Sequence, residues 1–314
     1  MKRILITGAL GQIGSELTLK LRSIYGAANV IATDIRKNDS EAAESGPFEL
    51  IDVTDLKTMG KVAQKYKADT ILHLAALLSA TAEVRPVFAW NLNMGGLLNA
   101  LETARELKTQ FFTPSSIGAF GPSTPKDNTP QETIMRPATM YGINKVAGEL
   151  LADYYFSKFN VDTRGLRFPG LISYVAPPGG GTTDYAVEIF YEAIQNGHYT
   201  SYLDKGTYMD MMYMPDALNA IIDLMEADPA KLQHRNAYNV TAMSFAPEEI
   251  AAEIKHHIPD FNMMYAVDPA RQKIADSWPN SIDASVAKEE WGFKTGFDLK
   301  SMTKDMIEKL KKKH

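Results

Sequence analysis

Cysteine is absent from this chain of 314 residues, which excludes disulfide bonds and thiolate-bound zinc. Positive charge is not in excess either, because a net charge of -5 gives no basic surface of the kind that binds nucleic acid. No apolar run reaches the roughly 18 residues of a membrane span, and the first apolar segment lacks the features of a secretion signal. These absences predict a cytoplasmic protein with no nucleic acid or membrane as a partner.

Short apolar runs alternate with longer amphipathic segments through the first half of the chain. The hydrophobic content of 45% is sufficient for one large domain or two coupled ones. We expect buried strands at residues 3–8, 30–34, 70–76, 110–116 and 163–169, and helices at residues 12–25, 56–66, 86–107 and 144–159. This alternation predicts an α/β fold in which helices cover both faces of a parallel sheet.

A glycine-rich turn joins the first expected strand to the first expected helix. Gly8, Gly11 and Gly14 lie in "ITGALGQIGSEL". Glycines there let the backbone approach a pyrophosphate, which binds the N–H groups at the start of a helix. The same pattern also occurs in turns that serve packing alone. Asp34 favours the first interpretation, because it ends the second strand twenty residues after Gly14, where a carboxylate binds the ribose of a dinucleotide.

The residues around Asp34 also bear on the choice of cofactor. A carboxylate repels the 2′-phosphate of NADP, so Asp34 predicts NAD, although Arg36 and Lys37 follow closely. Further along, Asp52 and Val53 are placed to flank the adenine, and the alternative for both is a simple turn.

A tyrosine and a lysine four residues apart are the main candidates for catalysis. Tyr141 and Lys145 would lie on one face of a helix. A phenol is a poor base at neutral pH, and a nearby ammonium stabilises its phenolate form. Upstream, Ser115 and Ser116 end a strand and carry hydroxyls suited to holding a substrate oxygen. Such a Tyr–Lys pair also occurs on ordinary surfaces, but a nucleotide loop, an acid, a serine and this pair in that order are a strong combination.

With this combination of motifs the chain resembles the extended short-chain dehydrogenase/reductase family over essentially its whole length. The resemblance implies a doubly wound parallel-sheet Rossmann domain with a smaller C-terminal substrate lobe. It assigns residues 1–168 and part of about 208–240 to the NAD-binding domain, and residues 169–207 and 241–314 to the substrate lobe. It also implies that Ser116, Tyr141 and Lys145 form the catalytic group.

The resemblance further implies a set of cofactor contacts. The segment "HLAA" corresponds to a strand end that lines the cofactor, "WNLNMGG" contains an asparagine near the nicotinamide ribose, and "RFPG" lies beside the nicotinamide. The residues expected to bind NAD are Gly8, Gly11, Gln12, Ile13, Gly14, Asp34, Ile35, Asp52, Val53, Leu74, Ala75, Ala76, Asn91, Tyr141, Lys145 and Pro169.

The second half of the chain departs from the nucleotide-sugar epimerases and dehydratases of this family. Pro169 and Gly170 stand where those enzymes carry an asparagine, and "DMMYMPD" replaces another of their characteristic segments. Neither segment of this chain contains an evident basic residue that could pair with the diphosphate of a sugar nucleotide. Instead, "SSIGAFGPSTP", "PPGGGTTDYAVEIF" and "YNVTAMSFAPEEI" resemble the short-chain group of L-threonine 3-dehydrogenases. That resemblance implies a small-molecule substrate, L-threonine, whose β-hydroxyl is oxidised with NAD to give 2-amino-3-oxobutyrate.

The substrate site is expected to combine hydroxyl groups with glycines. Residues 179–181 would let the backbone approach a small zwitterion, and Thr182 and Thr183 would supply hydroxyls at a helix start, which favours a carboxylate. The alternative is that one threonine caps the helix. For Ser79 the alternative is a turn hydroxyl, and for Trp278 the alternative is an aromatic residue of the core. The residues expected to contact the substrate are Ser79, Ser116, Tyr141, Gly180, Thr182, Thr183 and Trp278.

The family analogy also predicts a homodimer, in which the helices at residues 86–107 and 144–159 pair across a two-fold axis. We expect no metal site, because His256 and His257 are adjacent and therefore diverge on a helix. Two alternatives to a dehydrogenase stay open. One is a nucleotide-sugar 4-epimerase, and the other is a regulator that senses NAD without catalysis.

Overall fold

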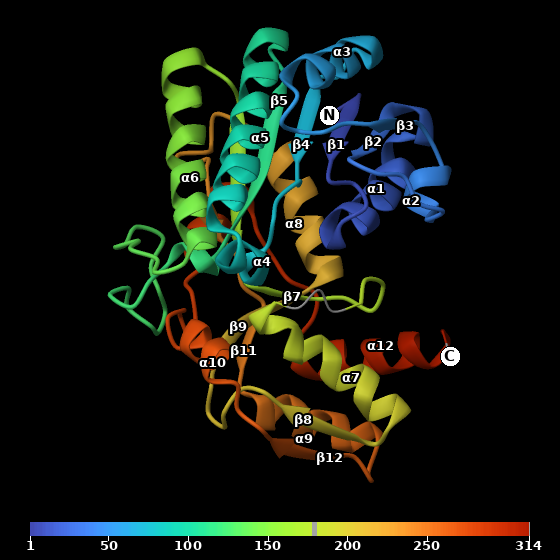
Figure 1. The fold of residues 1–314 in the computed structure, drawn as a ribbon, viewed down its shortest axis with the longest axis vertical. Helices are drawn as coiled ribbons and strands as arrows, with labels where there is room; N and C mark the ends of the chain where they lie inside the picture. The colour runs from blue at the N-terminus through green and yellow to red at the C-terminus, as the bar shows by residue number, and fades with distance from the viewer. Residues whose placement is uncertain (178–180, 314) are drawn as a thin grey trace. The chain divides into compact units, whose positions relative to one another are not determined.

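The computed structural model describes residues 1–177 and 181–313, and the chain forms two compact units (Figure 1). The first unit contains Met1–Ala119, Thr139–Arg167 and Ala220–Tyr238. The second contains Phe120–Ala138, Phe168–Asn219 and Asn239–His314. Each unit is therefore assembled from segments that are distant in the sequence.

A seven-stranded sheet with the order β10-β6-β5-β4-β1-β2-β3 forms the centre of the first unit. Strand β1 pairs in parallel with β2 and β4, and the pairs β2–β3 and β4–β5 are also parallel. The strand order reverses direction at β1, which confirms the doubly wound α/β fold. The strands are β1 (Ile4–Thr7), β2 (Val30–Asp34), β3 (Phe48–Leu50), β4 (Thr70–His73), β5 (Gln110–Ser116), β6 (Thr163–Phe168) and β10 (Tyr238–Asn239).

Helices α3, α5 and α6 share one apolar core with the sheet. Leu5 of β1, Ile71 of β4 and Leu101 of α5 are fully buried in this core, and burying an aliphatic side chain of this size contributes about 1.5–3 kcal/mol. Figure 1 shows α5 and α6 side by side. The helices that begin or end in this unit are α1 (Gln12–Tyr25), α2 (Glu41–Glu44), α3 (Leu56–Tyr66), α4 (Ser79–Val84), α5 (Pro86–Leu107), α6 (Met140–Phe159) and α8 (Met214–Glu226), with 3-10 turns η1 (Ala27–Asn29) and η2 (Ile117–Ala119).

Helix α6 begins at Met140, four residues before the predicted start. The Thr139 side chain accepts a hydrogen bond from the Gly142 N–H at 3.1 Å and so caps the helix. Because of this cap, Tyr141 and Lys145 both lie within the first two turns of α6.

The second unit contains two small sheets and a group of helices. Strand β9 (Met209–Tyr213) lies between β7 (Gly170–Ile172) and β11 (Met243–Phe245), parallel to the first and antiparallel to the second. Strands β8 (His198–Ser201) and β12 (Asn262–Tyr265) pair in parallel. The helical segments are η3 (Thr182–Asp184), α7 (Tyr185–Gln195), α9 (Pro247–His257), α10 (Pro269–Ala275), α11 (Ser285–Trp291) and α12 (Leu299–Lys311).

The segment Phe120–Ala138 belongs to the second unit, whereas we expected residues 1–168 to stay together. The Thr129 N–H donates to the Ser281 carbonyl at 2.9 Å, and the Asn280 N–H donates to the Lys126 carbonyl at 2.8 Å. These hydrogen bonds join the segment to a part of the chain about 150 residues away, a pairing that no local pattern in the sequence predicts.

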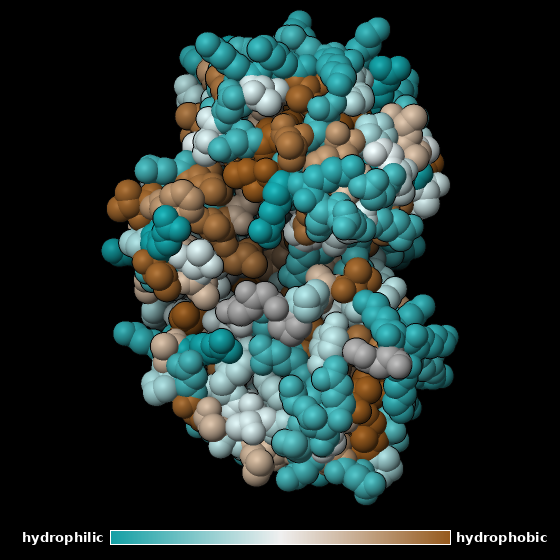
Figure 2. Space-filling model, turned by 45° about the vertical axis from the view of Figure 1, so that its right-hand side comes forward, coloured by the Kyte–Doolittle hydropathy of each residue, from teal (hydrophilic) through white to brown (hydrophobic). Residues whose placement is uncertain are grey.

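Apolar side chains are exposed on α4, α5 and α6 of the first unit. Val84 is 80% exposed, Val87 73%, Leu150 61% and Tyr154 50%. Figure 2 shows brown, apolar surface gathered in the upper part of its view. Exposure of this extent on neighbouring helices is typical of a protein interface. No helix among the described residues is long and apolar enough to cross a membrane.

Candidate active site

The turn between β1 and α1 brings backbone atoms unusually close together. Gly8 has a φ of +68°, which glycine adopts without strain. A Cβ on Gly14 would lie 2.2 Å from the Gly8 carbonyl oxygen, so no other residue has room there. The N-cap of α1 is Gly11, which makes no side-chain cap hydrogen bond, and the first turn contains Gln12 and Ile13. This geometry suits a pyrophosphate that approaches the N-terminus of α1.

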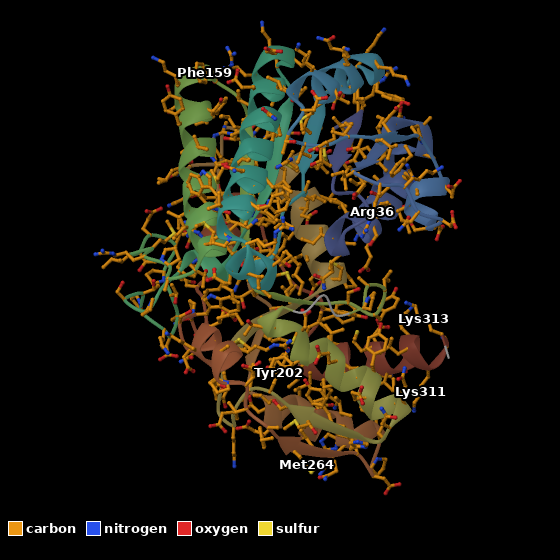
Figure 3. All side chains as sticks on the ribbon, viewed as in Figure 1. Arg36, Phe159, Tyr202, Met264, Lys311 and Lys313 are labelled. Carbon is orange, nitrogen blue, oxygen red and sulfur yellow. The ribbon has the colours of Figure 1, made fainter. Side chains whose placement is uncertain are left out.

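Asp34 ends β2 beside this turn. Its Oδ2 accepts a hydrogen bond from the Leu10 N–H at 3.1 Å, and its Oδ1 accepts one from the Ile35 N–H at 2.8 Å. Each carboxylate oxygen has a second lone pair, so Asp34 can still accept the hydroxyls of a ribose. The neighbouring Ile35 is 65% exposed, as suits a residue that covers part of a ligand. Arg36, labelled in Figure 3, follows on the same exposed segment.

Asp52 and Val53, which follow β3 after Ile51, differ in their surroundings. Asp52 accepts hydrogen bonds from the N–H and the hydroxyl of Thr54 at 2.9 and 2.7 Å, the geometry of the simple turn that the sequence left open. Val53 is buried, and its Cγ2 lies 2.7 Å from the position of a Cβ on Gly96. Val53 therefore packs against α5.

Ser116, Tyr141 and Lys145 come together between the end of β5 and the start of α6. Gly118 lies between the first two: a Cβ there would be 3.1 Å from the Tyr141 ring and 3.5 Å from Ser116 Oγ. Ser116 Oγ accepts a hydrogen bond from the Gly118 N–H at 3.1 Å. Lys145 Nζ lies 5.3 Å from the centre of the Tyr141 ring and donates to the Pro114 carbonyl at 2.6 Å. The structure thus assembles the hydroxyl, the phenol and the ammonium.

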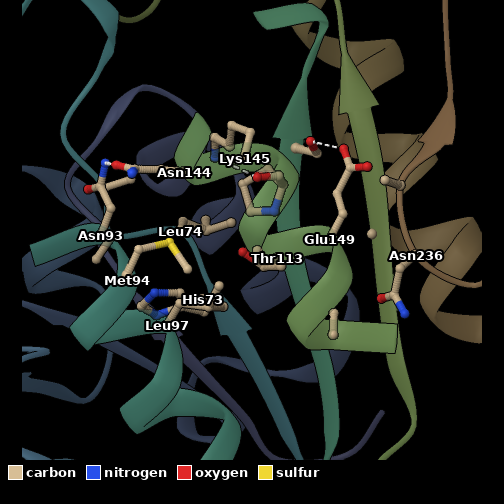
Figure 4. A pocket seen from close by; sticks show the side chains of 18 residues that line it. His73, Leu74, Asn93, Met94, Leu97, Thr113, Asn144, Lys145, Glu149 and Asn236 are labelled. Carbon is tan, nitrogen blue, oxygen red and sulfur yellow. Dashed lines mark hydrogen bonds between the residues drawn. The ribbon is translucent and has the colours of Figure 1, made fainter. Parts of the chain in front are cut away.

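Sequence analysis missed a buried ion pair next to this group. Glu149 and Arg167 are 7% and 5% exposed, and two guanidinium nitrogens contact the carboxylate, the closer at 2.8 Å. The Ser115 hydroxyl donates to the same carboxylate, as the dashed line in Figure 4 shows. No local pattern pairs these residues, because Glu149 has an ordinary place one helical turn after Lys145 and Arg167 lies in a separate predicted strand.

Lys145 lines a cavity within the first unit (Figure 4). It has room of about 40 Å³ for water, and a water molecule needs roughly 10–15 Å³ of such space. Leu74, Ala75 and Ala76 line it, as do Glu149 and Asn236. The buried Oδ1 of Asn236 has no hydrogen-bond partner among the described residues, so ordered water in the cavity would satisfy it.

His73 at the end of β4 also lines the cavity and is uncharged. Burial, and secondarily the positive charge of Lys145, lowers the pKa of the imidazole to about 3. Its Nδ1 lies 2.9 Å from the Thr7 hydroxyl, a hydrogen bond that orients the ring. His73 therefore contributes a neutral wall and leaves Lys145 as the positive group at the cavity.

The asparagine that faces this site is Asn93 rather than Asn91. Asn91 is exposed on α5, whereas Asn93 is buried, lines the cavity and donates to Asn144 Oδ1 at 3.0 Å. Asn93 also accepts from the Leu77 N–H at 2.8 Å. The segment "WNLNMGG" offers two asparagines, and only the packed face of α5 decides which of them lines the cavity.

The threonines of the segment "PPGGGTTDYAVEIF" lie in the second unit. Thr182 is 4% exposed. Thr183 packs so closely on Gly170 that a Cβ on this glycine would lie 2.9 Å from Thr183 Cβ and Cγ2. The Asp184 carboxylate accepts from the Gly181 N–H at 2.8 Å, and at neither η3 nor α7 does a threonine side chain supply the cap. The alternative role as a helix cap therefore gains no support.

The other substrate candidates belong to different units. Ser79 begins α4 in the first unit and is 8% exposed, while Trp278 lies in the second unit and is 6% exposed. Pro169, a cofactor candidate, lies between β6 and β7 in the second unit. Residues 179 and 180, which include Gly180, lie outside the described residues.

No metal centre is present in residues 1–177 and 181–313 in the form of three or more clustered His, Asp or Glu side chains. His256 and His257 end α9, and His257 Nε2 lies 3.9 Å from Glu253 Oε1.

Comparisons with known proteins identify the family. The model of the NAD dependent epimerase/dehydratase family matches residues 4–241. An uncharacterized epimerase/dehydratase of Staphylococcus saprophyticus is 62% identical over 314 residues, which cover 100% of this chain and 98% of that protein.

Two solved structures extend this likeness to three dimensions. The L-threonine dehydrogenase of Clostridium difficile aligns with a TM-score of 0.99 at 65% identity, over 100% of this chain and 98% of that one. The holo form of a Cupriavidus necator L-threonine dehydrogenase aligns with a TM-score of 0.96 at 48% identity, over 98% and 99%. These matches confirm the resemblance to short-chain L-threonine dehydrogenases and indicate NAD as the cofactor. The chain belongs to the NAD dependent epimerase/dehydratase family.

Proposed function

We propose that this protein is an NAD-dependent L-threonine 3-dehydrogenase, which oxidises the β-hydroxyl of L-threonine to give 2-amino-3-oxobutyrate. The observation that carries the proposal is the assembly of Ser116, Tyr141 and Lys145 at the end of β5 and the start of α6. It occurs in a chain 65% identical to the L-threonine dehydrogenase of C. difficile. A regulator that only senses NAD has no need of a phenol and an ammonium in contact range, so this arrangement favours an enzyme.

The residues at the carboxyl ends of β1, β2 and β4 suit NAD. The close turn at Gly8 and Gly14 would admit the pyrophosphate to the N-terminus of α1, and Asp34 would accept the adenosine ribose hydroxyls. Bound NAD supplies the oxidising power, because it accepts the hydride from the substrate carbon. We assign the remaining contacts to Gly11, Gln12, Ile13, Ile35, Asp52, Val53, Leu74, Ala75, Ala76, Pro169 and, in place of Asn91, Asn93.

The protein side chains handle the proton and the oxygen. Tyr141 as phenolate takes the proton of the substrate β-hydroxyl, and Ser116 holds the same oxygen by a hydrogen bond. Lys145 stabilises the phenolate by its charge at 5.3 Å from the ring centre. Because His73 is neutral, the positive charge at this point comes from Lys145 alone among the groups that line the cavity.

We assign substrate recognition to Ser79, Thr182, Thr183 and Trp278. L-Threonine is a small zwitterion with few apolar atoms, so its site must supply hydrogen bonds to an ammonium and a carboxylate. The hydroxyls of Thr182 and Thr183 lie at the start of a helical segment, where backbone N–H groups favour a carboxylate. The close packing of Thr183 Cβ and Cγ2 on Gly170 holds that side chain in place without a capping role.

We also propose a homodimer that buries the exposed apolar residues of α5 and α6, such as Val87, Leu150 and Tyr154. Paired helices of this kind form four-helix bundles. Sedimentation at micromolar concentration should give twice the chain mass of 34.7 kDa, and a single-chain mass would contradict this assembly.

The experiment that tests the function is steady-state NADH formation with a panel of β-hydroxy amino acids and sugar nucleotides. L-Threonine should give the highest kcat/KM. Turnover of a sugar nucleotide without net NADH would establish an epimerase instead, and NAD binding without turnover of any substrate would establish a regulator.

A further inference from the structure

Two adjacent serines end β5, and the structure gives them different partners. Successive side chains of a strand point to opposite faces of the sheet. The Ser115 hydroxyl donates to Glu149 of α6, whereas Ser116 Oγ accepts from the Gly118 N–H and lies beside the Tyr141 ring. The direction in which Ser116 points therefore depends on how Ser115 is held.

Glu149 connects three elements of the first unit. Its carboxylate accepts from Ser115 of β5 and from two guanidinium nitrogens of Arg167 of β6, whose three contacts lie between 2.8 and 3.2 Å. A bidentate pair of this kind fixes the geometry of both partners, because the guanidinium is planar and its donors are rigid. The contacts bind the carboxyl end of β5 to the helix that carries Tyr141.

The charge of Glu149 is balanced within this cluster. Arg167 of β6 and Lys145, one turn earlier on α6, are the positive groups near it, and His73 of β4 is neutral. Removing the carboxylate would leave the Arg167 charge buried and uncompensated near the catalytic group.

We propose that Glu149 is a positioning residue: through Ser115 it holds the end of β5 against α6, and so it sets the place of the Ser116 hydroxyl relative to Tyr141. The proposal rests on the proposed dehydrogenase function. It predicts that Ser115 and Glu149 affect the rate of the chemical step, although neither is expected to touch the substrate or NAD.

Two variants of Ser115 test this directly. Ser115→Ala removes the hydroxyl and changes no charge, and we expect kcat for L-threonine to fall by about tenfold or more, because small misplacements of a catalytic group are costly. The KM for NAD and the melting temperature should change little. Ser115→Thr keeps the hydroxyl, and its extra methyl can occupy the cavity that Ser115 lines, so it should restore most of the rate.

Glu149→Gln separates position from charge. With the Arg167 charge uncompensated, the acid limb of the kcat/KM profile should move to lower pH, because positive charge favours the phenolate form of the base. Ser115→Ala should leave the limb in place. The matched control is Glu102→Gln on α5, which removes a carboxylate that accepts from Tyr155 of α6 and pairs with Arg105. It should lower the melting temperature and leave kcat and the pH profile unchanged.

The outcomes distinguish this inference from the function on which it rests. If the wild-type protein forms no NADH from L-threonine, the proposed function is wrong. If the wild-type protein is active and Ser115→Ala has wild-type kcat, or Ser115→Thr is as slow as Ser115→Ala, the positioning role of Glu149 is wrong. Should Glu149→Gln fail to fold, the Ser115 pair still decides the question.

Discussion

The ammonium of Lys145 is held by the carbonyl of Pro114 at 2.6 Å, and it faces the Tyr141 ring at 5.3 Å from its centre. A backbone contact of this kind fixes Lys145 independently of the phenol hydroxyl. Tyr141→Phe should therefore remove the base and leave the rest of the group in place. We expect kcat to fall below about a tenth of the wild-type value, with unchanged NAD affinity by calorimetry. A variant that retains more activity would contradict the role of Tyr141.

Asp34 should determine the preference for NAD. Asp34→Ala removes the acceptor for the ribose hydroxyls and the charge that repels a 2′-phosphate, so kcat/KM for NAD should fall by about tenfold while the ratio of NADP to NAD activity rises. The matched control is Asp69→Ala, which also removes a carboxylate that accepts two backbone N–H groups, those of Lys2 and Arg3. If both variants change the NAD kinetics equally, Asp34 has no specific role.

Thr183 can be tested with three substitutions. If its hydroxyl binds the substrate, Thr183→Ala and Thr183→Val should both lower kcat/KM for L-threonine by about tenfold, the value of one hydrogen bond to a charged group. Thr183→Ser should stay close to wild type, although it loses the methyl that packs on Gly170. The reverse order, with Val active and Ser slow, would show that packing and not the hydroxyl matters.

Tyr202 should position the start of η3. Its hydroxyl lies 3.2 Å from the Gly181 carbonyl and 3.3 Å from the Thr182 carbonyl, and Arg271 covers its ring at 4.1 Å; Figure 3 labels it below α7. Tyr202→Phe removes only these hydrogen bonds, so we expect a several-fold lower kcat/KM for L-threonine, with NAD affinity unchanged.

The control for Tyr202→Phe is Tyr199→Phe in the same strand region. The Tyr199 hydroxyl donates to the Glu188 carboxylate of α7 at 3.2 Å. Equal kinetic losses in the two variants would attribute the effect to general loosening of this unit.

Asp210 should make stability depend on pH. It is 1% exposed on β9 and accepts hydrogen bonds from the Thr241 hydroxyl at 2.6 Å and from the Ile282 N–H. Burial raises the pKa of its carboxyl to about 7, from 3.8 for an exposed carboxyl. Because the folded state holds the proton more tightly, the contribution of Asp210 is complete below pH 3.8 and is lost as pH rises to about 7. The loss is on the order of 4 kcal/mol.

Asp210→Asn isolates this contribution. The amide oxygen can accept from one of the two donors, Thr241 or Ile282, as a carboxyl oxygen does, and the side chain does not ionise. Urea unfolding near pH 5 and pH 8 should show a smaller decrease in the free energy of unfolding for the variant than for the wild type. Equal decreases would exclude Asp210 as the source.

Local signals predicted much of the first unit. The helices at residues 12–25, 56–66 and 86–107 begin and end at the predicted positions. Their start signals are local: Asp55 caps α3 by accepting from the Lys57 and Thr58 N–H groups, and proline occupies the first position of α5.

Contacts between distant segments could not be predicted in this way. Glu149 has an ordinary place in a helical pattern, and only the fold brings it to Arg167 and Ser115. Asn91 and Asn93 are equivalent in sequence, and the side of α5 that packs on the sheet decides which one is buried. Both cases depend on tertiary packing, which periodicity within one segment does not specify.

The chain passes between its two units after Ala119, Ala138, Arg167, Asn219 and Tyr238. During synthesis on the ribosome, the sheet of the first unit therefore stays incomplete until β10 (Tyr238–Asn239) has emerged, about three quarters of the way along the chain. The second unit must wait longer still, for α12. Proteins whose domains are contiguous can fold them one after another during translation. Here a premature stop codon at any point before residue 238 leaves both units unfinished. Because each unit consists of three separate segments, no contiguous fragment of the gene encodes either unit alone.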